Sequence, residues 1–336
     1  LAQYGLWQAI LRLPLGITAD SVGWHKPFIV IGFGFAAFGA VILAQAEGTT
    51  QLATGRAVTG LAAATWVPLV VVFTGLFKPH ETVRATAMLT FIGTSGRVLA
   101  TSVTGALNEL GGYALAFFLA AGAAVLAILF VLPAQSKRRA PRKPSVVSIT
   151  RLISRRDVLL PALLAAASQY ANWAATFSFT PILARELGAT DITLSALLSL
   201  HLGVVLVGNL AATAIVNRIG ARRLVSISFL LLSGAIGLVA LAPSLALIFV
   251  AQFFIGLSQG MGYPVMMGLS IRYVDSENRT TAMGLHQSVY AIGMFAGPWL
   301  SGILADAIGN QPMLGVTAFV ILALGLSGVR LLSAKS

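Results

Sequence analysis

Long uncharged runs of apolar residues recur along almost the whole chain. A helix that crosses a bilayer needs about 20 apolar residues, and runs of that length are Pro27–Ala46, Ala57–Phe77, Tyr113–Ser136, Val158–Ala184, Ile192–Asn217, Thr280–Ala305 and Ala307–Val329. The run Leu224–Ile271 is long enough for two spans with a turn at Pro243. Two further spans, Leu1–Ala19 and Ala85–Asn108, each contain an arginine. The pattern predicts eleven membrane-spanning helices and, because the runs are continuous rather than alternating, excludes a β-barrel.

Composition supports this prediction. Apolar residues make up 57% of the 336 residues and charged residues only 10%, whereas soluble domains carry about 25% charge. These values exclude a soluble enzyme and a disordered chain. The chain has no cysteine, so it has neither disulfides nor thiolate chemistry. No metal-binding spacing, phosphate-binding glycine loop or paired carboxylates within a span are present. We therefore expect no cofactor and no enzymatic activity.

The positive charges gather on one side of the predicted topology. If the loop at His25–Lys26 is cytoplasmic, every second loop and the C-terminal tail are cytoplasmic too, and together they hold 18 of the 22 lysines and arginines. The net charge of +12 therefore orients the protein in a bilayer. A nucleic-acid partner is not expected, because the basic stretch 136–156 lacks stacking aromatic residues.

The two sides of that basic stretch resemble each other. Gly16–Lys26 aligns with Thr213–Arg223, and Gly105–Gly112 aligns with Gly302–Gly309, both at an offset of 197. Gly60 and Pro68 align with Gly256 and Pro264, and Arg84–Met88 aligns with Arg279–Met283. The chain divides into an N-terminal bundle (1–135), a cytoplasmic linker (136–156) and a C-terminal bundle (157–336). The second unit begins with a helix that has no counterpart in the first, so we expect Leu1 to lie inside the second helix of a twelve-helix protein.

Three motifs together resemble the major facilitator superfamily of secondary transporters. The first is Gly16-x-x-x-Asp20-x-x-Gly23-x-(basic)-Lys26, repeated half a chain later. The others are Arg56-x-x-x-Gly60, in the predicted span Ala57–Phe77 and the residue before it, and Gly293-x-x-x-Gly297-Pro298, in Thr280–Ala305. The resemblance implies an all-α fold with two pseudo-symmetric six-helix bundles, eleven of whose twelve helices are present here. It also implies alternating access around a central site.

The loop motif predicts a conformational latch on the cytoplasmic side. Asp20 is expected to cap the following turn or to pair with a neighbouring cation such as Arg84, and Gly23 to form a tight turn with positive φ. Gly16 would allow close helix approach. The full set of predicted latch residues is Gly16, Asp20, Gly23, Lys26, Arg84, Asn217, Gly220 and Arg223.

Arginines within the spans are candidates for substrate binding. A charge in hydrocarbon costs at least about 2.5–3.5 kcal/mol, so such residues face partners or cavities. Arg12, Arg56 and Arg97 lie within spans, and no carboxylate occupies the middle of any span. Three interpretations are open. The arginines form an anion site, or one of them pairs with an acidic residue of the absent first helix and that acid carries the coupling proton. In the third, the arginines have a structural role and form hydrogen bonds between helices. Arg97 is the strongest substrate candidate.

Polar residues on three spans are the remaining candidates. Those within Val158–Ala184 are Gln169, Asn172 and Trp173; those within Leu224–Ile271 are Gln259 and Tyr263; those within Thr280–Ala305 are His286, Gln287 and Tyr290. Gln169 and Asn172, three apart, share a helix face. Such faces bind an uncharged solute or join helices. A histidine such as His286 titrates near neutral pH and suits proton coupling, or it is a hydrogen-bonded bystander.

Together these observations predict a secondary active transporter of a small solute, proton-coupled, with export favoured over uptake. The alternatives are an anion transporter that uses the intramembrane arginines, and a non-transporting scaffold or receptor on the same fold. The expected partners are the substrate, protons and the lipid bilayer. The expected state is a monomer in a bacterial cytoplasmic membrane.

Overall fold

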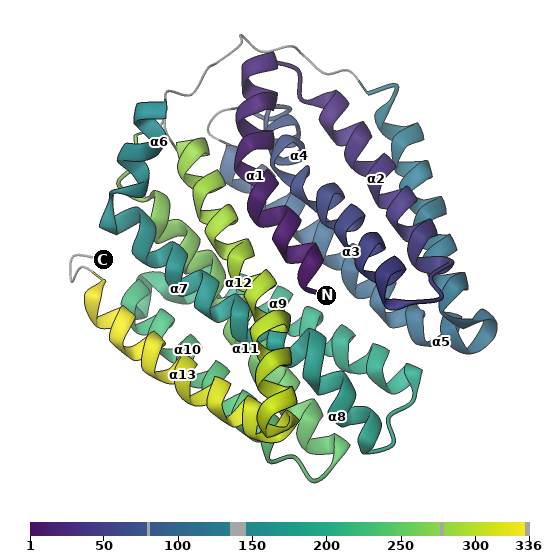
Figure 1. The fold of residues 1–336 in the computed structure, drawn as a ribbon. Coiled ribbons are helices and arrows are strands. Elements are labelled where there is room, and N and C mark those ends of the chain that lie inside the picture. The colour runs from purple at the N-terminus through teal and green to yellow at the C-terminus, as the bar shows by residue number, and fades with distance from the viewer. Residues whose placement is uncertain (79–80, 135–145, 276–278, 333–336) are drawn as a thin grey trace.

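The computed structural model describes residues 1–78, 81–134, 146–275 and 279–332, without the side chains of 82–84, 86–87, 146–149, 213 and 279–280. The described residues form helices joined by short turns and contain no strand. Figure 1 shows the helices of the N-terminal half, purple to teal, beside those of the C-terminal half, teal to yellow. The predicted all-α fold is confirmed.

Every predicted span is largely helical, although not all qualify by length and hydropathy. Among the described residues, 8 helices are long and apolar enough to cross a membrane, and one of them, Met88–Val131, contains two predicted spans. Two predicted spans fall outside this set. The first is α1 (Ala2–Val22), which contains Arg12, and the second is the predicted span Val158–Ala184, which is divided into three helical segments.

The N-terminal half consists of α1, α2 (Lys26–Ala44), α3 (Thr49–Ala64), α4 (Trp66–Thr74) and α5 (Thr82–Val131). The backbone of α5 leaves helical geometry at Gly111 and Gly112, so α5 is two spans, as the sequence predicts. The predicted start of a span at Ala57 was wrong, because α3 begins at Thr49. The first part of this helix contains Arg56 and several threonines, and such polar residues do not belong to an apolar run.

The C-terminal half consists of α7 (Arg156–Asn172), η2 (Trp173–Phe179), α8 (Thr180–Glu186), α9 (Asp191–Ile219), α10 (Ala221–Ala240), α11 (Leu245–Ile271), α12 (Arg279–Ile308) and α13 (Asn310–Leu331). The predicted turn at Pro243 is confirmed between α10 and α11. The segment η2 is a π-helix. Pro181 follows it and has no N–H to donate to the preceding turn, which favours a wider turn at this point.

The internal repeat is visible in the backbone. Gly23 and Gly220 both have positive φ, at 69° and 84°, and so do Gly112 and Gly309, at 69° and 88°. Each pair is separated by 197 residues, the offset found in the sequence. Glycine adopts this conformation without a steric penalty, so both halves turn sharply at equivalent places. The predicted positive φ of Gly23 is confirmed.

A second repeated feature is a close contact between helices. A Cβ at Gly60 would lie 2.8 Å from the carbonyl oxygen of Tyr4, and a Cβ at Gly256 would lie 2.7 Å from that of His201. Tyr4 and His201 are again 197 residues apart. The same absence of a side chain therefore brings the same two helices together in each half.

At one end of each half, a basic side chain donates hydrogen bonds to carbonyl oxygens at the end of the last helix. We call the end that carries the loops predicted to be cytoplasmic the basic end, and the other the opposite end. At the basic end Lys26 donates to the carbonyl oxygens of Leu132 (2.5 Å) and Ala134 (2.8 Å), where α5 ends. Arg222 donates to the carbonyl oxygen of Arg330 near the end of α13. Cations stabilise the free carbonyls at helix C-termini, so each half ties an inner loop to its last helix.

The motif Gly293-x-x-x-Gly297-Pro298 packs α12 against α7. A Cβ at Gly293 would overlap the carbonyl oxygen of Ala166, and one at Gly297 would lie 2.6 Å from that of Tyr170. Backbone atoms cannot move aside as a side chain does. The motif is therefore a helix-packing element of the C-terminal half.

Gly293→Ala is expected to destabilise the protein markedly. Overpacking of this kind costs about 1–3 kcal/mol, which corresponds to a fall in melting temperature of about 3–10 °C for a chain of this size. Thermal unfolding in detergent measures it. Gly302, on the same helix with nothing within 4 Å of its Cβ position, supplies the control, because Gly302→Ala should leave stability equal or higher. Equal melting temperatures for the two variants would contradict the tight packing.

Candidate functional site

The two halves meet along two helix pairs, α1 with α12 and α5 with α9. A Cβ at Gly5 would overlap the backbone of Phe295. A Cβ at Gly105 would lie 2.6 Å from the carbonyl oxygen of Asp191 and 2.7 Å from the Cα of Ile192. Both glycines stand toward the opposite end. The halves are therefore in backbone contact there, across both pairs.

A cavity of about 720 Å³ lies between the halves. This volume is in the range of small-molecule sites. The lining comes from α1, α2, α3 and α5 on one side and from η2, α8, α9 and α11 on the other. Its polar and charged residues are Tyr4, Arg56, Thr59, Arg97, Thr101, Thr104, Asn108, Tyr113, Trp173, Thr176, Thr180, Asp191, Ser195 and Gln252.

Two of the three predicted arginines line this cavity. Arg97 is exposed, lines the cavity and, among the described residues, donates only to Thr94 Oγ1, at 3.4 Å. Arg56 is partly buried and makes no side-chain hydrogen bond or ion pair within the part of the chain that the structure describes. Among the described lining residues the one acid is Asp191, which pairs with Arg185. The described part of the cavity wall therefore carries an excess of positive charge.

Aromatic rings form another part of the wall. Tyr4 of α1 stacks on Trp173 of η2 with ring centroids 5.5 Å apart, and Trp173 lies 4.8 Å from Phe177. Behind them, the ring of His201 meets the edge of Phe177 at 6.1 Å. The π-helical turn places Trp173, Thr176 and Phe177 on the cavity. Such a wall suits an aromatic or apolar solute body.

The third arginine forms a different site. Arg12 is buried and donates to Gln8 Oε1 on its own helix and to Gln287 Oε1 on α12, 275 residues away. Its guanidinium carbon lies 5.9 Å from the centre of the Tyr290 ring. Gln287 Nε2 donates to the hydroxyl of Tyr263 at 2.6 Å. We call Arg12, Tyr263, His286, Gln287 and Tyr290 the Arg12 cluster. The cluster joins the two halves, and it contains no carboxylate among the described residues.

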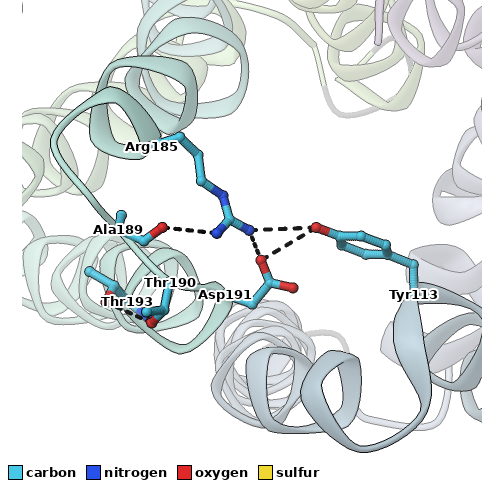
Figure 2. Close-up of polar contacts among 6 residues, drawn as sticks. All are labelled: Tyr113, Arg185, Ala189, Thr190, Asp191 and Thr193. Carbon is cyan, nitrogen blue, oxygen red and sulfur yellow. Dashed lines mark hydrogen bonds and ion pairs between the residues drawn. The ribbon is translucent and has the colours of Figure 1, made fainter.

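Three residues at the opposite end form a second junction of the halves. Figure 2 shows Arg185 pointing to Asp191, with which it forms an ion pair, and to Tyr113 of the other half. The Tyr113 hydroxyl lies 3.3 Å from Asp191 Oδ1 and 3.5 Å from Arg185 Nη2. Arg185 also donates to the carbonyl oxygen of Ala189, at 2.8 Å. We call Tyr113, Arg185 and Asp191 the opposite-end cluster; Tyr113 and Asp191 also line the cavity.

The predicted latch residues are partly assembled. Asp20 Oδ1, in the last turn of α1, lies 2.9 Å from Nε2 of His25 in the loop that follows, so its described partner is His25. A Cβ at Gly16 would lie 3.4 Å from a methyl carbon of Val67, an ordinary contact. The side chain of Arg84 lies outside the described residues. In the second half Asn217 and Arg223 are exposed and make no side-chain hydrogen bond in the described part of the chain.

The polar face predicted on α7 has another use. Gln169 Nε2 donates to Gln259 Oε1 at 2.7 Å, and Gln259 donates to Ser168 Oγ at 2.9 Å. Asn172 is buried with its Oδ1 unpartnered in the described part, and it does not line the cavity. Gln169 and Gln259 therefore join α7 to α11. Joining helices was the alternative to solute binding that the sequence left open for this face.

Several cavity residues had no signal in the sequence. Tyr4, Asn108, Thr176 and Gln252 line the cavity, and Thr176 Oγ1 donates to Gln252 Oε1 at 3.2 Å. Single polar residues in apolar spans are common. Only the assembled helices show which of them face the cavity.

The structure has two repeated halves of membrane-spanning helices with a cavity between them. This architecture is that of a polytopic membrane transporter. The model of the Major Facilitator Superfamily matches residues 1–168 and 162–335. The chain belongs to this superfamily, and it is a multi-pass membrane protein. A curated relative, the inner membrane transport protein YajR of Escherichia coli K12, is 40% identical over 57 residues, which is 17% of this chain and 12% of that protein.

Solved structures share the fold at low sequence identity. The human organic anion transporter MFSD10 is 16% identical and has a TM-score of 0.73, with 99% of this chain and 82% of that chain covered. A POT family transporter in complex with 5-aminolevulinic acid is 10% identical with a TM-score of 0.83, covering 99% and 86%. The Escherichia coli fucose:proton symporter FucP is 16% identical with a TM-score of 0.67, covering 99% and 90%.

Proposed function

We propose that this protein transports a small organic anion by alternating access, with the cavity between the halves as its binding site. One observation carries the proposal: Arg56 and Arg97 both line the cavity, and neither has a carboxylate partner in the described part of the chain. An unpaired guanidinium in a membrane protein is costly. A bound anion would supply the missing charge.

The rest of the solute is inferred from the cavity wall. A guanidinium matches a carboxylate, sulfonate or phosphate with two parallel hydrogen bonds. The rings of Tyr4, Trp173 and Phe177 offer contact area to an apolar or aromatic body. One structural relative is described as an organic anion transporter. The likeness to it concerns the fold, so the proposal depends on the arginines.

Orientation, coupling and direction belong to the same proposal. The asymmetry of lysine and arginine favours a bacterial inner membrane with the basic end, the linker and the C-terminus in the cytoplasm. A proton gradient is the proposed driving force, with export as the proposed direction. The protein is proposed to act as a monomer, because the cavity is formed between the halves of one chain.

Uptake by proteoliposomes tests the proposal. An aromatic sulfonate stays ionised and crosses lipid poorly, and the corresponding sulfonamide is a neutral solute of the same shape. We expect saturable uptake of the sulfonate at a rate at least about ten times that of the sulfonamide, since a charged hydrogen bond contributes about 1.5–3 kcal/mol. Equal uptake of both would contradict the anion site. Saturable binding without any uptake would favour the scaffold alternative.

A further inference from the structure

A second hollow lies at the basic end of the C-terminal half, between the start of α7 and the ends of α11 and α13. Its volume is about 290 Å³, and it shares no lining residue with the cavity between the halves. We call it the basic-end groove. Its apolar lining is Leu160, Pro161, Leu269, Leu331 and Leu332. The groove is therefore a separate site with a largely apolar wall.

The groove ends where α7 and α13 come into contact. A Cβ at Gly328 of α13 would lie 2.5 Å from Cδ2 of Leu164 on α7. Arg156, which also lines the groove, precedes Leu164 by eight residues, about 12 Å of helix. The headgroup layer of one leaflet is about 5–8 Å deep. The groove therefore covers the depth of a headgroup and of the first carbons of its acyl chains.

Two arginines at the groove are available to an anion. Arg156 is exposed and makes no side-chain hydrogen bond or ion pair in the described part of the chain. Arg272 is exposed as well, and its guanidinium carbon lies 5.2 Å from the centre of the Tyr273 ring. Tyr273 itself lines the groove. The two guanidinium groups thus reach the groove from α7 and from the end of α11.

The acids beside the groove interact with a third arginine. Arg155 donates to both oxygens of Asp157, at 3.1 Å and 2.7 Å, and to the carbonyl oxygen of Tyr273, at 2.8 Å. The bond to Asp157 raises the pKa of Arg155, and the nearby charge of Asp275 adds to this effect. Among the described residues here, three arginines stand against two aspartates. An excess of positive charge is left at the groove.

We propose that the basic-end groove binds one anionic phospholipid of the adjoining leaflet. Arg156 and Arg272 bind the phosphate, and Leu160, Leu269 and Leu331 contact the glycerol backbone and the first carbons of the acyl chains. A free phosphate would leave this apolar wall uncovered, and a lipid without net charge would not balance the positive charge. Basic pockets between membrane helices on the cytoplasmic side bind such headgroups.

Titration with lipid, followed by native mass spectrometry of the protein in detergent, tests the proposal. The parent protein should bind one dioleoyl phosphatidylglycerol at least about ten times more tightly than dioleoyl phosphatidylethanolamine, the factor expected for one charged hydrogen bond. Arg156→Gln should weaken the binding of phosphatidylglycerol by about tenfold. Leu331→Gln, an exposed position of the groove, should weaken it by about threefold or more.

A matched control separates the groove from general attraction of charge. Arg151 is an exposed arginine of α6 (Val146–Ile153) and does not line the groove, so Arg151→Gln should bind phosphatidylglycerol as the parent does. Phosphatidylglycerol should also raise the melting temperature of the parent more than that of Arg156→Gln. Equal affinity for the two lipids, or equal weakening in Arg151→Gln and Arg156→Gln, would overturn the proposal. Displacement of the lipid by an equal concentration of glycerophosphoglycerol, the headgroup without chains, would show a free-anion site and overturn it too.

Discussion

Arg97→Ala is expected to lower the uptake of an anionic solute by about 10- to 100-fold. A hydrogen bond to a charged group contributes about 1.5–3 kcal/mol, and each 1.4 kcal/mol is a factor of ten. Arg97 lines the cavity and donates only to Thr94 within the described part of the chain, so its removal should leave the packing intact. Arg97→Lys keeps the charge but loses the planar fork and should retain an intermediate rate. Initial rates of sulfonate uptake at several concentrations measure both variants.

Two comparisons make this result specific. Arg151 is an exposed arginine of α6 (Val146–Ile153), outside the cavity, and Arg151→Ala should transport as the parent does. Thermal unfolding of Arg97→Ala should match the parent, which would separate lost binding from lost folding. Undiminished sulfonate uptake by a folded Arg97→Ala protein would overturn the anion site.

The sequence predicted the helices well because the bilayer constrains them strongly. A span must be long enough for the hydrocarbon and must satisfy its own backbone hydrogen bonds, so apolar runs mark helices reliably. The prediction failed at Thr49, where the helix extends through polar residues that the apolar criterion excluded. It also missed η2, because a π-turn depends on the local backbone next to Pro181 and leaves no mark in hydropathy.

The candidate site was predicted only in part, for a reason that Gln169 and Arg12 illustrate. Spacing on one helix shows which residues share a face, but it does not show which helix that face meets. The sequence therefore left Gln169 open to a solute or to a neighbouring helix, and in the structure Gln169 donates to Gln259. Arg12 was open to an anion, an acid or a structural bond between helices, and in the structure it donates to Gln287, 275 residues away. Arg97, the strongest substrate candidate in the sequence, lines the cavity, and its contact with substrate stays a prediction.

The opposite end of the interface is closed by backbone atoms as well as by side chains. Thr101 Oγ1 and Ser199 Oγ lie 2.9 Å apart between α5 and α9. One turn further along α5, a Cβ at Gly105 would lie 2.6 Å from the carbonyl oxygen of Asp191, closer than real side chains approach. Asp191 also belongs to the opposite-end cluster. If transport alternates between two closed ends, the space at Gly105 is required for one of them.

Gly105→Ala should therefore hold the opposite end open and reduce uptake by about tenfold or more, since forcing a methyl group into a packed contact costs about 1–3 kcal/mol. The Thr101→Cys/Ser199→Cys pair reports closure directly, because the protein has no other thiols and the two hydroxyls already meet. Its disulfide yield should fall by a similar factor in the Gly105→Ala background. Gly96→Ala, on the same helix with nothing within 4 Å of the new Cβ, should change neither quantity. Equal yields in the two backgrounds would mean that α9 can withdraw at Asp191 without opening the interface, and closure would then depend on the Tyr113 contact instead.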